Sequence, residues 1–220
     1  MQRTPEPELM DTAEQAEAYA IADFAEVNRR FVELFRARFG DFASGSVVDL
    51  GCGPADIPIR LARELPNVRI TGVDGAEAML AHAAAAIDRA RLSERIELVR
   101  GVLPGAVPGG RTFDAVVSNS LLHHLHDPSV LWREVRVLAK SGAPILVIDL
   151  MRPATKEDAQ QLVETYSANE RPILKQDFFN SLCAAFTIDE VRAQLDRADL
   201  RELSVEAISD RHLLISGRRR

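Results

Sequence analysis

Apolar positions follow two different periods along this chain. Short continuous apolar runs, which are typical of buried parallel strands, occur at 46–50, 67–74, 96–100, 113–118 and 143–149. Between these runs, apolar residues recur every three or four positions, which predicts helices over 55–65, 76–90 and 128–140. Strands that alternate with helices in this way predict an α/β fold: a Rossmann-like, mostly parallel sheet with helices on both faces and right-handed crossovers.

The two ends of the pattern differ from its middle. Residues 1–10 are expected to be disordered, whereas aromatic residues at helical spacing over 12–39, ended by Gly40, predict helices that form an N-terminal lid over 1–40. The segment 150–186, after the fifth strand, is long for a connection and is interpreted as a cap insertion on the acceptor side.

A capping box marks where the regular pattern resumes after this insertion. Thr187 is followed three residues later by Glu190, which predicts a helix over 188–197. Two further strands are expected at 200–208 and 211–216, which makes seven strands with the last one antiparallel.

A glycine turn between the first strand and the first helix is the main candidate site. In Asp49-Leu50-Gly51-Cys52-Gly53-Pro54-Ala55, the glycines allow a tight turn, and the free N–H groups of the next helix point at whatever lies over it. Asp56 stands where a dinucleotide-binding turn has a glycine, and no Gly-Lys-Ser/Thr follows, so a pyrophosphate is disfavoured. The turn therefore suits a cationic or zwitterionic ligand; an ordinary strand–turn–helix without ligand is the alternative.

An acidic residue closes the second strand. Asp74 lies 21 residues after Gly53, the spacing at which a carboxylate can accept hydrogen bonds from both hydroxyls of a ribose. The competing interpretation is that Asp74 caps the helix that begins near Ala76, and the two roles are compatible.

The fourth strand leads into His123-His124-Leu125-His126-Asp127-Pro128. Three histidines within four residues cannot all face one point on a regular element, and no metal site is expected. They either shape the loop, or His123 or His124 faces the acceptor pocket as a proton acceptor near neutral pH. Asp149, at the end of the fifth strand, is a third candidate base at the same edge.

Composition excludes several classes of partner. The 220 residues are 46% hydrophobic, carry a net charge of −6 and contain two cysteines, so we expect one sizeable core, no nucleic-acid interface and a reducing, cytoplasmic location. No apolar run reaches the length of a membrane span, so no membrane insertion is expected. The sequence leaves open whether the protein is a monomer or a homodimer.

These segments resemble the motifs of the class I S-adenosylmethionine-dependent methyltransferases. The glycine turn is similar to the first motif, Val73-Asp74-Gly75-Ala76-Glu77-Ala78-Met79-Leu80 to the second, and the F-D-x-V strand with H-H-x-x-D-P to the fourth. The last combination is similar to the branch that includes the ubiquinone/menaquinone-biosynthesis enzymes. It differs from the N/D-P-P-Y/F motif of enzymes that methylate amide or exocyclic nitrogens.

The resemblance implies S-adenosylmethionine as the cofactor, a small-molecule acceptor and a methyltransferase domain over 41–220. It also implies where the cofactor contacts lie, at Tyr19, Asp49, Gly51, Cys52, Gly53, Asp74, Gly75, Met79, Gly101, Val102, Leu103, Ser118, Asn119 and Ser120. The chain departs from the family at Val102, where an acid usually binds the adenine amino group, so backbone groups of 101–103 would hold the adenine. A cofactor-binding protein without turnover and a nicotinamide-dependent oxidoreductase are the alternatives.

Overall fold

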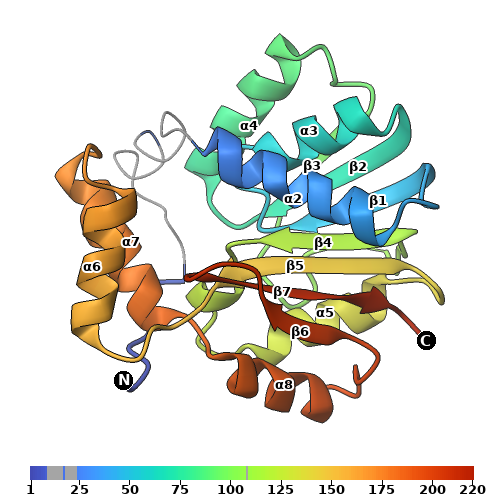
Figure 1. Cartoon of the computed structure of the whole chain (residues 1–220). Helices are drawn as coiled ribbons and strands as arrows, with labels where there is room; N and C mark the ends of the chain where they lie inside the picture. Colours follow the sequence, from blue (N-terminus) through green and yellow to red (C-terminus); the bar gives the residue numbers. More distant parts are fainter. Residues whose placement is uncertain (9–16, 18–23, 108) are drawn as a thin grey trace.

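The computed structural model describes residues 1–8, 17, 24–107 and 109–220, and a seven-stranded sheet lies at its centre (Figure 1). The strand order is β3-β2-β1-β4-β5-β7-β6, and every pairing is parallel except those of β7 with β5 and β6. The strands are β1 Ser44–Leu50, β2 Asn67–Asp74, β3 Ile96–Arg100, β4 Ala115–Asn119, β5 Pro144–Leu150, β6 Ser204–Ala207 and β7 His212–Arg218. The predicted Rossmann-like sheet with an antiparallel last strand is confirmed.

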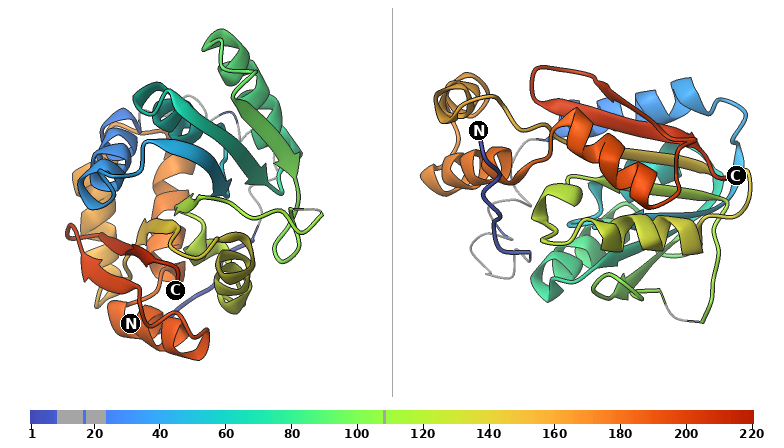
Figure 2. Two further views of the ribbon diagram at one scale, coloured as in Figure 1. Left: turned by 90° about the vertical axis from the view of Figure 1, so that its right-hand side faces the viewer. Right: turned by 90° about the horizontal axis from the view of Figure 1, so that it is seen from below.

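Helices cover both faces of the sheet, as the end view in Figure 2 shows. Val47 packs with residues of α2 (Ala25–Arg38), α3 (Asp56–Glu64) and α4 (Glu77–Arg89), whereas its neighbour Val48 packs with residues of α5 (Ser129–Leu138) and α8 (Ile188–Arg197). Successive side chains of a strand point to opposite faces, so a doubly covered strand is apolar throughout. This is why β1 and β5 read as continuous apolar runs.

Two strands begin later than the sequence predicts. β4 begins at Ala115, not at residue 113, because Phe113 bridges to Ala139 and the carboxylate of Asp114 accepts the backbone N–H of Ser46 at 2.9 Å. β6 begins at Ser204, not at residue 200, because Leu200 accepts the backbone N–H of Leu203 in a turn. The start of the first predicted run is therefore used for contacts with other segments, and the start of the second is used for a turn.

The segment 150–186 forms a separate helical layer beyond the carboxyl ends of the parallel strands (Figure 1). It contains α6 (Lys156–Tyr166), which starts with a capping box from Thr155 and Asp158, and α7 (Pro172–Ala184), which has proline at its start. Ala159, Val163 and Leu182 form a small core between these two helices. The layer thus has its own apolar contacts and faces the open edge of the sheet.

The first eight residues are held against this layer, which differs from the predicted disorder of residues 1–10. The Arg3 guanidinium donates to the backbone carbonyls of Ala184, His123 and Leu125 and lies 4.0 Å from the Phe186 ring centroid. None of the helices that the structure describes is long and apolar enough to cross a membrane.

Candidate functional site

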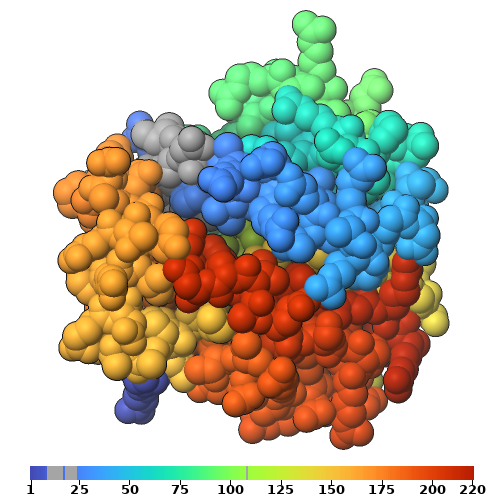
Figure 3. Space-filling model, in the orientation of Figure 1, coloured from blue at the N-terminus to red at the C-terminus, as the bar shows by residue number. Residues whose placement is uncertain are grey.

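A cavity of about 420 Å³ lies at the carboxyl edge of the sheet. The turns that follow β1, β2, β3 and β4 meet on one side of it, and α6, α7 and the start of β7 close the other. Figure 3 shows the surface hollowed where α2, the α6–α7 layer and the β6–β7 hairpin come together. Of the predicted cofactor residues, those that line the cavity are Gly51, Gly53, Asp74, Gly75, Met79, Gly101, Val102, Leu103, Asn119 and Ser120.

The two glycines of the first turn serve different purposes. Both have positive φ, +74° at Gly51 and +50° at Gly53, a region that favours glycine. A Cβ on Gly51 would lie 2.9 Å from the side chain of Leu121, whereas a Cβ on Gly53 would meet no atom within 4 Å. Gly51 is therefore required by packing, and Gly53 leaves open space on the cavity side.

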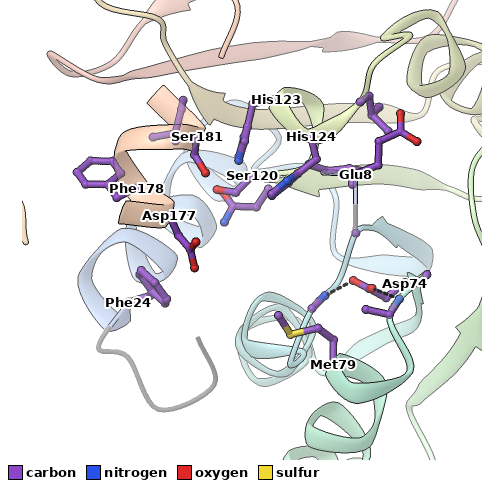
Figure 4. A pocket seen from close by; sticks show the side chains of 18 of the residues that line it. Glu8, Phe24, Asp74, Met79, Ser120, His123, His124, Asp177, Phe178 and Ser181 are labelled. Carbon is purple, nitrogen blue, oxygen red and sulfur yellow. Dashed lines mark hydrogen bonds between the residues drawn. The ribbon is translucent and has the colours of Figure 1, made fainter. Parts of the chain in front are cut away.

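Asp74 ties the first turn to the second strand. Its Oδ2 accepts the backbone N–H of Gly53 at 2.8 Å, and its Oδ1 accepts that of Ala76 at 2.9 Å (Figure 4). Burial raises the pKa of Asp74, although hydrogen bonds from the backbones of Ala76, Gly53 and Gly75 act against this rise. Each carboxylate oxygen has a second lone pair, so the helix-capping role and a ribose contact are compatible in this geometry.

Asp49 lies beneath the turn and does not line the cavity. Its side chain is 1% exposed, and its Oδ1 has no hydrogen-bond partner among the described residues. Burial raises the pKa of Asp49 well above its ordinary range, and the charge of Asp74 raises it further. Two adjacent buried carboxyl groups favour a cationic ligand, because a nearby positive charge stabilises their ionised forms.

The predicted contacts at the ends of β3 and β4 divide into lining and supporting residues. Val102 lines the cavity and is 58% exposed. Asn119 also lines the cavity, and its Nδ2 donates to Oδ1 of Asn28 at 3.5 Å. Cys52 and Ser118 do not line the cavity; Ser118 is buried and donates its hydroxyl to the Leu50 carbonyl at 2.7 Å. Tyr19 lies outside the described residues.

His123 and His124 both line the cavity, on the short 3₁₀ helix η1 (Leu122–His124) that follows β4 (Figure 4). Asp149 does not line it: its Oδ1 lies 2.6 Å from Nδ1 of His123, and its Oδ2 accepts the backbone N–H of Leu122 at 2.7 Å. Asp149 therefore positions His123 from below.

The pKa values of the two histidines are shifted in opposite directions. Burial alone would lower the pKa of His123, but the charges of Asp149 and Glu6 outweigh it and hold the pKa above its ordinary value. Burial, together with the charge of His123, lowers the pKa of His124 to about 3, so His124 is neutral near pH 7. His126 points away to the N-terminal segment, where its Nε2 lies 2.8 Å from the carbonyl of Glu6.

Several lining residues have no signal in the sequence. Phe24, Val27 and Asn28 come from the start of α2, and Glu8 comes from the N-terminal segment. On the opposite wall, α6 and α7 supply Tyr166, Leu174, Asp177, Phe178 and Ser181. The segment 150–186 was predicted to cap the acceptor side, but which of its residues face inwards depends on how α6 and α7 pack.

The architecture and the first turn resemble those of one class of enzyme. The seven-stranded order with an antiparallel β7, a glycine turn after β1 and an acid after β2 is that of the class I methyltransferases. Residues 47–142 match the family model described as a methyltransferase domain. The predicted resemblance to the class I S-adenosylmethionine-dependent methyltransferases is thereby confirmed.

Comparison with curated proteins gives partial matches to named enzymes. A release factor glutamine methyltransferase of Gloeobacter violaceus is 40% identical over 95 residues, which cover 43% of this chain and 33% of that protein. The ubiquinone/menaquinone biosynthesis C-methyltransferase UbiE of Desulfotalea psychrophila is 31% identical over 146 residues, 66% of this chain and 56% of that protein. The chain thus spans between a third and about half of these relatives.

Solved structures match over almost the whole chain. A methyltransferase from Methanococcus maripaludis, described as putative and S-adenosyl-L-methionine-dependent, has a TM-score of 0.72 at 23% identity and covers 100% of this chain and 97% of its own. The plantazolicin methyltransferase BpumL, solved with a desmethylplantazolicin analogue and S-adenosylhomocysteine, has a TM-score of 0.72 at 13% identity, with coverage of 94% and 91%. At these identities the matches show the shared fold.

Proposed function

We propose that this chain transfers a methyl group from S-adenosylmethionine to a small-molecule acceptor. The observation that carries the proposal is the first turn with its two acids: open space at Gly53, Asp74 beside it and, beneath it, an oxygen of Asp49 that has no partner among the described residues. An ammonium or sulfonium group would be stabilised there by the two acids. The match of residues 47–142 to the methyltransferase family supports the same conclusion.

The residues present fit the cofactor along one wall of the cavity. Asp74 would accept the ribose hydroxyls, Asp49 would attract the amino group of the methionine portion, and Gly53 would leave room for it. Met79 and the backbone of 101–103 would contact the adenine. When bound, the cofactor supplies a methyl group already activated on a sulfonium, so the chain needs mainly to align the acceptor and exclude water.

The opposite wall would bind the acceptor. We propose that α6 and α7 act as the acceptor-side cap, and that residues 1–40 act as a lid over the ligand end of the sheet. His123 and His124 lie between the two walls and are the candidates to accept a proton from the acceptor; Asp149 orients His123. Ser120-Leu121-Leu122 follows Asn119, so the N/D-P-P-Y/F motif is absent, which favours a small molecule over a protein amide.

A nicotinamide-dependent oxidoreductase fits less well. Asp56 is paired with Arg60, Oδ2 to Nε at 2.7 Å, and with Asn28 Nδ2 at 2.7 Å, so it holds the position at which a dinucleotide turn has glycine.

The test is a calorimetric titration of the full chain with S-adenosylmethionine, S-adenosylhomocysteine and NAD, followed by a screen of small-molecule acceptors with a labelled methyl donor. We expect micromolar binding of the two sulfur nucleosides and no binding of NAD. Binding of NAD in preference to S-adenosylhomocysteine would overturn the proposal. Binding of the nucleosides without transfer to any acceptor would indicate a binding protein.

A further inference from the structure

One carboxylate and two imidazoles gather between η1 and the N-terminal segment. Glu6, His123 and His124 each offer a ligand atom, and these atoms all lie within 4.8 Å of one another. Glu6 Oε1 lies 3.6 Å from Nε2 of His123 and 3.2 Å from Nδ1 of His124. The side chains are 10%, 4% and 14% exposed, so the three atoms converge in a nearly closed space.

The orientation of His123 is fixed by its other ring nitrogen. Nδ1 lies 2.6 Å from Oδ1 of Asp149, so an N–H at Nδ1 donates to that carboxylate and the lone pair of Nε2 faces Glu6. Metal-binding histidines in proteins are commonly held in this way, with the second ring nitrogen bonded to a carboxylate.

His124 presents an unused lone pair to the same point. Its Nδ1 is buried and has no hydrogen-bond partner among the described residues, although Glu6 Oε1 is 3.2 Å away. The backbone of Pro7 also lies near the ring and acts against the lowering of its pKa. A divalent cation between Nδ1 and the Glu6 carboxylate would use the lone pair of a neutral ring and would pair the buried carboxylate.

We propose that Glu6, His123 and His124 bind one divalent first-row transition-metal ion, through Oε1, Nε2 and Nδ1. Two ligand atoms at about 2.1 Å from a tetrahedral ion lie about 3.4 Å apart, close to both measured separations from Glu6. Two histidines and one carboxylate form the ligand set of catalytic zinc sites and of non-haem iron sites. The spacing within 123–126 does not reveal this set, because its third ligand comes from the N-terminal segment and His126 lies apart.

Two consequences follow for the molecule. An ion at this point would fasten residues 1–8 to the cavity wall, in addition to the hydrogen bonds of Arg3 and that of Ser181 Oγ to Glu6 Oε1 at 3.0 Å. Three protein ligands also leave a position on a tetrahedral ion for water or for an acceptor atom. That second consequence rests on the proposed function, whereas binding of the ion does not.

The simplest rival is a metal-free network in which protonated His123 lies between Glu6 and Asp149. The positive charge of Arg3, whose guanidinium bonds to the His123 carbonyl at 2.9 Å, disfavours both a metal ion and a protonated imidazole there. The two arrangements differ at Nδ1 of His124, which the rival leaves without a hydrogen-bond partner among the described residues and the metal uses as a ligand.

The experiment uses the full chain, stripped with a chelator and free of cofactor. Titration with Co²⁺, followed by visible d–d absorption, and competition with Zn²⁺ should show one site per chain. His124→Ala should weaken binding at least 100-fold, and the isosteric Glu6→Gln at least 10-fold. His82→Ala, which removes a histidine on α4 outside the cluster, is the matched control and should bind as the parent protein does.

Binding of Co²⁺ that is equal in all four proteins, or only millimolar in the parent, would overturn the proposal and favour the metal-free network. If His124→Ala does not fold, Glu6→Gln alone decides, because it preserves shape and adds no cavity. S-adenosylhomocysteine binding by the metal-free protein is measured in parallel. If S-adenosylhomocysteine does not bind, the result counts against the proposed function. It does not bear on the metal site, which the Co²⁺ titration tests independently.

Discussion

The two walls of the cavity are built in opposite ways. On the proposed cofactor wall, formed by the turns after β1, β2, β3 and β4, the lining residues lie close together in the sequence or at fixed offsets along parallel strands, as with Gly53 and Asp74. On the acceptor wall, contacts join remote segments, such as Arg3 to the carbonyl of His123, 120 residues away. The first wall follows from the order of the strands, while the second depends on contacts between segments that are far apart in the sequence.

The largest effect is expected from Asp74→Ala on the cofactor wall. Removing the carboxylate removes the proposed ribose contacts, and hydrogen bonds to charged groups contribute about 1.5–3 kcal/mol each. We expect the Kd of S-adenosylhomocysteine to rise about 100-fold or more, measured by calorimetry. Asp74→Asn separates charge from shape, and Asp88→Ala on α4 is the control. An affinity within twofold of the parent in both Asp74 variants would remove Asp74 from the site.

The two glycines of the first turn allow a paired test within that wall. Alanine at either position adopts positive φ at a cost of about 1–2 kcal/mol, and at Gly51 it also meets Leu121 at 2.9 Å, adding about 1–3 kcal/mol. Urea unfolding should show Gly51→Ala as the less stable variant. Gly53→Ala should lose less stability, and its main effect should be weaker binding of the cofactor. Equal losses of stability in the two variants would contradict the packing role of Gly51.

The same contrast explains what the sequence could predict. The glycine turn, Asp74 and the strands over 67–74 and 96–100 follow from local periodicity and from the rule that parallel strands end at one edge. Asp149 was expected at the pocket edge, but a strand buried on both faces does not reveal that its one carboxylate turns beneath η1. Arg3 and Glu6 carry no periodic signal at all, since their partners lie on η1 and α7.

On the acceptor wall, Arg3→Ala should loosen the cap without affecting the cofactor wall. The variant loses three hydrogen bonds from the guanidinium to carbonyls and the stacking on Phe186, roughly 3–5 kcal/mol in total. Hydrogen exchange should become faster in Pro172–Ala184 and remain unchanged in β1 and β2. Arg3→Lys keeps the charge but not the several N–H donors of the guanidinium, so its exchange rate in α7 should lie between those of the parent protein and Arg3→Ala. Unchanged exchange in α7 would show that the N-terminal segment does not hold it.

The smallest effect concerns His212, which lines the acceptor wall at the start of β7. Burial, and next the charge of Arg211, lower the pKa of His212 to about 4. Because the folded pKa lies below the unfolded value of about 6.5, the unfolded chain takes up the proton first, and stability is lost as pH falls from about 6.5 towards 4. At pH 5 the loss amounts to about 1–2 kcal/mol, and His212→Asn should remove that part of the pH dependence.

Urea unfolding at pH 5 and pH 8 measures the free energy of unfolding of the parent protein and of His212→Asn. If the difference between the two pH values is the same in both proteins, the acid sensitivity belongs to other groups.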